Sequence, residues 1–64
     1  MNNNLAAIRK QNGLTQTALA KKAGVSRVII NQLETGARDV TTSKTMLKLA
    51  RALEVSIADI FLIN

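Results

Sequence analysis

Residues 15–36 read TQTALAKKAGVSRVIINQLETG and predict two short helices joined by a tight turn. Gly24 falls where the first helix must stop, because glycine adopts a positive φ without the steric penalty of a Cβ atom. Ala20, four residues earlier, is small enough for two helices to cross closely. Val25 can fill the corner of the turn, and the Ser26 hydroxyl can cap the second helix. This combination at fixed spacing is a signature of the helix-turn-helix motif.

The second of these helices, predicted over residues 27–35, has one apolar face and one largely polar face. On a helical wheel, Ile29, Ile30 and Leu33 fall within an arc of about 100°, which is the width of a buried stripe. The opposite arc holds Arg27, Val28, Asn31, Gln32 and Thr35. This second face is not needed for core packing, and most of its side chains can form hydrogen bonds. The pattern favours a role in recognition.

The whole chain predicts an all-α fold, a compact bundle of five short helices in a single domain over residues 1–64. The helices are expected at about residues 4–12, 16–23, 27–35, 43–53 and 57–62. The apolar positions that recur at helical spacing are expected to form the core: Leu5, Ile8, Leu19, Ala20, Ala23, Met46, Leu49, Ala50, Leu53 and Ile60. The expected helix caps are Asn2, Asn3 or Asn4, Thr15, Ser26, Thr42 or Ser43, and Ser56.

Composition excludes several classes of function. The chain has no cysteine and no histidine, which removes disulfides, thiol chemistry and the usual zinc ligands. The four carboxylates are scattered along the sequence rather than paired, so no acid–base pair for catalysis is apparent. We therefore expect no enzyme activity, no metal, no cofactor and no small-molecule ligand.

Charge and hydropathy indicate the kind of partner. Nine Lys and Arg against four Asp and Glu give a net charge of +5, which favours polyanions, although an anionic membrane surface would attract the chain as well. No apolar run approaches the roughly 20 residues of a membrane span, and the first residues lack the layout of a signal peptide. We expect a cytoplasmic protein that is associated with the nucleoid when bound to DNA.

Four side chains on the outer face of residues 27–35 are candidates for contact with base edges in a major groove. Arg27 is placed to bond a guanine bidentately or to bind a phosphate, and Gln32 to pair with an adenine. Asn31 has similar chemistry but could equally face the DNA backbone, while Val28 could contact a thymine methyl group. The alternative is that all four are ordinary solvated surface residues. That explanation suits a single polar residue better than a set of four that share one face of a helix.

Six further residues are candidates for phosphate contact. Free backbone N–H groups and the positive end of the helix dipole favour a phosphate at helix N-termini. Thr15, Gln16 and Ser26 lie at such positions, and their roles as local caps are compatible with it. Thr35 ends the predicted helix over residues 27–35 and Arg38 comes just after it, while Lys44 shares a basic helix face with Lys48 and Arg51. For Arg38 and the lysines, a free surface position is the main alternative.

Glu34 is predicted to pair with a basic residue inside the protein. Its wheel position flanks Ile30, and a carboxylate that faced DNA would repel the phosphates. Arg9, in the first predicted helix, is the candidate partner.

Residues 14–36, LTQTALAKKAGVSRVIINQLETG, followed by residues 47–61, LKLARALEVSIADIF, resemble the DNA-binding domain of phage repressor and Cro proteins, the xenobiotic-response-element (XRE) type of helix-turn-helix. The resemblance implies a five-helix fold like that of lambda repressor and a twofold dimer on operator DNA. It implies that Gln16 contacts a phosphate and braces the recognition helix, and that Thr35 contacts the DNA backbone. Arg27, Val28 and Gln32 would be the base-contacting residues, and Arg9 with Glu34 would match the family's internal ion pair.

A homodimer is also expected on geometric grounds, because one short helix contacts only a few base pairs. Ile57, Phe61, Leu62 and Ile63 form an apolar group near the C-terminus that could supply the interface. Ile57 and Phe61 could equally close the core of the monomer.

The leading hypothesis is a transcriptional regulator, most simply a repressor, that binds double-stranded DNA at a palindromic operator. An antitoxin or a restriction-modification controller would use the same domain. The rival from another class is a protein-interaction module that no longer contacts DNA and binds a protein through Val28 and Ile29.

Overall fold

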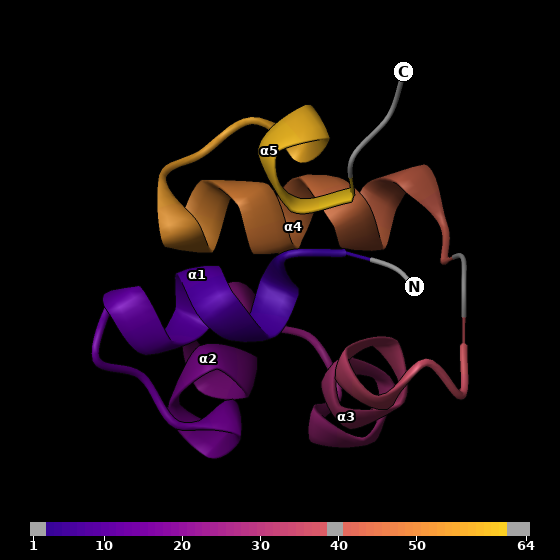
Figure 1. Ribbon diagram of the computed structural model, residues 1–64, viewed down its shortest axis with the longest axis horizontal. Coiled ribbons are helices and arrows are strands. Elements are labelled where there is room, and N and C mark those ends of the chain that lie inside the picture. The colour runs from indigo at the N-terminus through magenta and orange to yellow at the C-terminus, as the bar shows by residue number, and fades with distance from the viewer. Residues whose placement is uncertain (1–2, 39–40, 62–64) are drawn as a thin grey trace.

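The computed structural model of the chain describes residues 3–38 and 41–61 and confirms the all-α fold (Figure 1). Five helices lie in this part of the chain: α1 (Leu5–Gln11), α2 (Gln16–Ala23), α3 (Arg27–Thr35), α4 (Ser43–Leu53) and α5 (Ile57–Phe61). The first helix is one residue shorter at each end than the predicted 4–12, because Asn4 and Asn12 occupy the cap positions. Residue 62, predicted in the last helix, lies outside the described residues.

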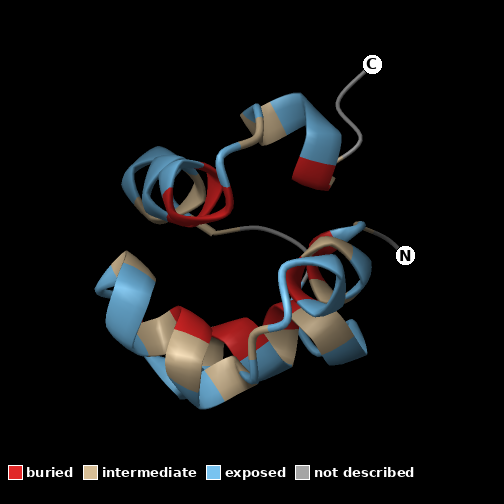
Figure 2. Cartoon of the chain, turned by 90° about the vertical axis from the view of Figure 1, so that its left-hand side faces the viewer, coloured by how far each residue is buried: buried red, intermediate tan, exposed pale blue. Residues whose placement is uncertain are grey.

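The helices form two layers, with α4 and α5 lying over α1, α2 and α3 (Figure 1). The helix α2 packs against both α3 and α4, while α1 contacts α3 and α5. Buried positions lie on the sides of the helices that face the other layer (Figure 2). Every helix therefore contributes to one shared core, and the outer side of α3 is left to solvent.

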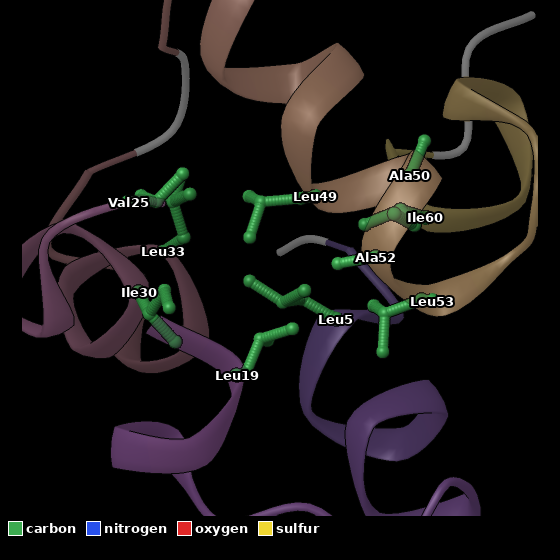
Figure 3. Packing of buried hydrophobic residues seen from close by; sticks show 10 residues of the cluster. All are labelled: Leu5, Leu19, Val25, Ile30, Leu33, Leu49, Ala50, Ala52, Leu53 and Ile60. Atoms are coloured by element: carbon green, nitrogen blue, oxygen red, sulfur yellow. The ribbon is translucent and has the colours of Figure 1, made fainter. Parts of the chain in front are cut away.

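The core is aliphatic, and each helix supplies at least one side chain that is fully buried (Figure 3). Each such leucine or isoleucine contributes on the order of 2 kcal/mol through burial. The buried cluster consists of Leu5, Leu19, Val25, Ile30, Leu33, Leu49, Ala50, Ala52, Leu53 and Ile60. Two positions on α4 differ from expectation. Met46, in the first turn, is only half-buried and lies outside this cluster, whereas Ala52 is part of it.

The residues that precede α1 connect it to α3 and α5. The backbone N–H of Asn4 donates to the carbonyl of Ile60 at 2.6 Å, and its side-chain amide donates to the carbonyl of Asp59 at 3.2 Å. Asn3 donates from Nδ2 to the carbonyl of Leu33 at 3.0 Å and accepts the backbone N–H of Leu5 at 3.0 Å. Asn3, rather than the N-cap residue Asn4, thus supplies the side-chain cap of α1.

The helix α4 ends on a residue that is not glycine but adopts the left-handed conformation. Thr42 caps its start by accepting the N–H of Thr45 at 3.2 Å. At its end Glu54 has φ +58°, the one positive φ outside glycine among the described residues. A side chain with a Cβ atom pays a steric penalty in this conformation that glycine avoids.

Replacing Glu54 by glycine should therefore stabilise the protein. We expect Glu54→Gly to raise the free energy of unfolding by about 1 kcal/mol, measured by urea denaturation monitored by circular dichroism. Glu54→Ala is the matched control, since it removes the same charge but keeps the Cβ atom. A glycine variant no more stable than the alanine variant would contradict the explanation.

Candidate nucleic-acid interface

The turn between α2 and α3 is held by hydrogen bonds from residues that the sequence singles out. Gly24 adopts φ +71°, and its N–H together with that of Val25 donates to the carbonyl of Ala20, at 2.9 and 3.1 Å. A Cβ atom on Gly24 would meet nothing within 4 Å, so the backbone conformation rather than space requires glycine. Ser26 accepts the N–H of Val28 at 3.1 Å and caps α3. The start of α3 is thereby set relative to α2.

The helix α3 presents to solvent most of the face that the helical wheel assigns to recognition. Its inner side buries Ile30 and Leu33 completely or nearly so. Gln32 is half-buried, and the other members of the outer face, Arg27, Val28, Asn31 and Thr35, are exposed. Val28 is 58% exposed, whereas Ile29 packs against the core, so the apolar pair proposed for protein binding is reduced to one exposed side chain.

Arg9 and Glu34 form an ion pair between α1 and α3. Nε of Arg9 donates to Oε2 of Glu34 at 2.6 Å and Nη2 donates to Oε1 at 3.0 Å, with the two side chains 10% and 7% exposed. The remaining guanidinium nitrogen, Nη1, donates to the carbonyl of Leu14 at 2.7 Å. Gln16, the first residue of α2, donates from Nε2 to Oε1 of Glu34 at 3.0 Å. The pair therefore joins α1, α2 and α3.

Protonation of this pair is set by competing effects. Burial raises the pKa of Glu34, but hydrogen bonds from Arg9 and Gln16 and the charges of Arg9 and Lys10 outweigh it and hold the pKa below its ordinary value. The hydrogen bond to Glu34 raises the pKa of Arg9 despite burial. Both groups are therefore charged at neutral pH, and the Glu34 carboxylate acts only as an acceptor.

Two hydrogen bonds on the outer face of α3 join side chains whose pairing the sequence does not predict, although the family resemblance implies that Gln16 braces this helix. Gln16 donates from Nε2 to Oδ1 of Asn31 at 3.2 Å as well as to Glu34. Arg38, in the segment after α3, donates from Nε to Oε1 of Gln32 at 3.0 Å, and its backbone N–H donates to the carbonyl of Gln32 at 3.1 Å. Arg38 was expected at a phosphate, and nothing in the sequence indicates that it meets Gln32 six residues earlier.

Five of the six phosphate candidates are exposed, namely Thr15, Ser26, Thr35, Arg38 and Lys44, and Gln16 is half-buried. Thr15 and Ser26 serve as helix caps, with Thr15 accepting the N–H of Ala18 at 3.0 Å. Thr35 donates to the carbonyl of Gln32 at 3.4 Å and is exposed. Lys44 is exposed in the first turn of α4.

The predicted dimer residues are only partly described. Ile57 and Phe61 are half-buried and pack against the core cluster, while Leu62 and Ile63 lie outside the described residues. Within residues 3–38 and 41–61, no cluster of three acidic side chains suited to a metal ion is found. None of the described helices is both long and apolar enough to cross a membrane.

The helix-turn-helix family model matches residues 5–60 of the chain. The chain belongs to this family of DNA-binding transcriptional regulators. In solved structures, the fold is similar to the N-terminal DNA-binding domain of SinR from Bacillus subtilis, with a TM-score of 0.87, 24% identity and coverage of 95% of this chain and 87% of that one. The likeness to SinR concerns the fold alone.

Relatives in this helix-turn-helix family differ in length. An uncharacterised helix-turn-helix-type transcriptional regulator of Methanocaldococcus jannaschii is 44% identical over 62 residues, which cover 97% of this chain and 92% of that protein. The antitoxin HipB of Escherichia coli K12 is 41% identical over 54 residues, covering 84% of this chain and 60% of the antitoxin. A HipB of another E. coli strain is 39% identical, with 84% of this chain and 56% of the antitoxin covered. The chain thus spans less than two thirds of the length of the antitoxins.

Loss of the Glu34 charge should destabilise this helix-turn-helix domain far more than loss of an exposed charge. Glu34→Gln leaves the buried guanidinium of Arg9 without its counter-charge, and we expect a loss on the order of 3–5 kcal/mol. Asp59→Asn is the control: Asp59 accepts the N–H of Ser56 at 3.0 Å but is exposed. Thermal unfolding of the two variants measures the difference, and equal melting temperatures would refute the prediction.

The pH dependence of stability tests whether the ionised carboxylate of Glu34 is the group that stabilises the fold. Because the pKa of Glu34 is lowered in the folded state, its stabilisation is complete above the unfolded value of about 4.3 and is lost as pH falls through the folded value. The stability gap between the native protein and Glu34→Gln should therefore narrow as pH drops below about 4. A constant gap across this range would mean that the ionised carboxylate is not the stabilising group.

Proposed function

We propose that this chain binds double-stranded DNA sequence-specifically as a homodimer at a palindromic operator and represses transcription by occluding a promoter. The observation that carries the proposal is the outer face of α3, where Arg27, Val28 and Asn31 are exposed on a helix whose inner side is buried in the core. A recognition helix needs this combination, because base contacts depend on a rigidly oriented helix in the major groove.

Charge supports the same proposal. The only described ion pair, Arg9–Glu34, is neutral as a unit and lies away from the solvent-facing side of α3. The exposed cations Arg27, Arg38 and Lys44 then remain to meet phosphates beside the groove. Phosphate contacts of this kind supply affinity that falls steeply with salt, and they fix the register of the protein on the duplex.

A twofold dimer follows from the small contact area of one α3. A second copy would place a second α3 one helical turn away, at about 34 Å, on the same face of B-form DNA. We infer that the dimer interface includes Ile57 and Phe61, which are only half-buried in the monomer, together with Leu62 and Ile63.

Selection of binding sites from a random duplex library at near-physiological salt tests the proposal. We expect a palindromic consensus with half-sites about one turn apart. Arg27→Ala should weaken binding to it by about 1–3 kcal/mol and relax the preference at one base position. Arg51→Ala, which removes the same charge from an exposed position on α4, should weaken binding less and leave the base preference unchanged. Equal losses would show that charge alone drives binding, and enrichment of no motif would contradict the function.

The likeness to antitoxin HipB favours a second candidate, an antitoxin that binds a toxin in addition to DNA. This role predicts a stable complex with a toxin protein. Co-expression of the two proteins followed by size-exclusion chromatography would detect that complex, whereas a stand-alone regulator would elute without a partner.

A further inference from the structure

The segment that follows α3 folds back over the last turns of that helix. Gly36 takes φ +84°, a left-handed conformation that suits glycine, and reverses the direction of the chain. Two residues later, the backbone N–H of Arg38 donates to the carbonyl of Gln32 at 3.1 Å. The hydroxyl of Thr35 donates to the same carbonyl at 3.4 Å. These bonds place the backbone of Arg38 beside Gln32, at the outer face of α3.

The side chain of Arg38 then meets the side chain of Gln32. Nε of Arg38 donates to Oε1 of Gln32 at 3.0 Å. A guanidinium carries only donors, so the amide group that faces Arg38 must be the oxygen, and the amino group Nε2 lies on the other side of the amide. Because the backbone bond already places Arg38, this contact costs less entropy than a contact between two side chains on unconnected segments.

The contact leaves Gln32 able to bind a base. An amide oxygen has two lone pairs, and Arg38 occupies one of them. No described residue accepts a hydrogen bond from Nε2 of Gln32. The second lone pair and Nε2 together are the acceptor and the donor of a bidentate contact to adenine, the base that the sequence suggests for Gln32. Arg38 therefore restricts the orientation of the amide without using up the groups that a base needs.

Arg38 also keeps donors for the DNA backbone. Of the N–H groups on its guanidinium, the contact to Gln32 uses only the one on Nε. The N–H groups of Nη1 and Nη2 donate to no acceptor in the described part of the chain, and the residue is exposed. Two such N–H groups match two oxygens of a phosphate. One side chain can thus contact a phosphate and hold Gln32 at the same time.

We propose that Arg38 bridges a DNA phosphate and Gln32, and that it determines base specificity as well as adding affinity. This inference rests on the DNA-binding function proposed above and gives one residue two linked tasks. Its Nη groups bind the phosphate, while Nε holds the Gln32 amide in one of the two orientations that differ by a half-turn about its last side-chain bond. Arg38 is a positioning residue, because it acts on base choice through Gln32.

Binding-site selection with the full chain and its variants tests the effect on base choice. Gln32→Ala first identifies the contacted position as the one whose preference disappears. Arg38→Ala keeps the backbone N–H that bonds the Gln32 carbonyl but frees the amide to turn. It should reduce the preference at that position by about threefold or more, because an amide without a fixed orientation discriminates less between base edges.

Lys44→Ala is the matched control for this selection. It removes one exposed positive charge from a position whose side chain makes no hydrogen bond to Gln32 within residues 3–38 and 41–61. It should weaken binding and leave the base preference unchanged, as expected for a contact to phosphate alone. Circular dichroism confirms that each variant is folded before selection.

A double-mutant cycle on the selected operator tests the link between the two residues. In the Gln32→Ala background, Arg38→Ala should reduce affinity about threefold less than it does in the native protein. Lys44→Ala should have the same effect in both backgrounds to within about twofold. The salt dependence of affinity tests the phosphate contact: Arg38→Ala should lower the slope of log K against log salt by about 0.9.

The outcomes separate this inference from the function on which it rests. An unchanged base preference in Arg38→Ala, or additive effects of Arg38→Ala and Gln32→Ala, would leave Arg38 as a phosphate contact only and overturn the bridge. An unchanged salt slope in Arg38→Ala, or no position altered by Gln32→Ala, overturns it as well. In each case the palindromic motif of the native protein still supports operator binding. Failure of the native protein to enrich any motif overturns the DNA-binding proposal and this inference with it.

Discussion

The ion pair between Arg9 and Glu34 is the interaction on which the orientation of α3 depends. It lies where α1, α3 and the link before α2 meet, and Gln16 at the start of α2 adds a further bond to the carboxylate. A buried charge is compensated only while its partners stay in place, so such a pair favours one arrangement of the helices over other compact arrangements. The core alone is built from interchangeable aliphatic side chains and would specify this arrangement less strictly.

Polar contacts extend from that pair to the surface. A chain of hydrogen bonds runs from Arg9 through Glu34 and Gln16 to Asn31. It satisfies the buried charges of Arg9 and Glu34 and also orients the exposed side chain of Asn31. On the other edge of α3, Arg38 orients Gln32. Side chains whose orientation is set before binding lose less conformational entropy when they meet a partner. The outer face of α3 is in this sense preorganised.

Local chemistry explains which features were predictable. Gly24 and Ser26 act through their own backbone and side chain, and the apolar spacing of α3 requires only helical periodicity, so these elements follow from the sequence. Arg9 and Glu34 could be paired because a carboxylate beside Ile30 needs a cation. The Arg38–Gln32 contact could not be foreseen, because it depends on the path of an irregular segment after Gly36. The left-handed conformation of Glu54 and the hydrogen bond from Asn3 to the carbonyl of Leu33 could not be foreseen either, because residue type does not reveal them.

The hydrogen bonds of Asn4 to Asp59 and Ile60 have a consequence for how the protein forms. They join residues at opposite ends of the described chain, while α1 must also pack on α5. Contacts of such long sequence separation form late, because closing the loop between them costs entropy that nearer contacts do not. On the ribosome, the backbone N–H and side-chain amide of Asn4 would therefore stay hydrogen-bonded to water until the fifth helix has been synthesised. Asn3, next to this junction, also bonds the carbonyl of Leu33, so the last contacts that hold α3 form when the fifth helix is in place.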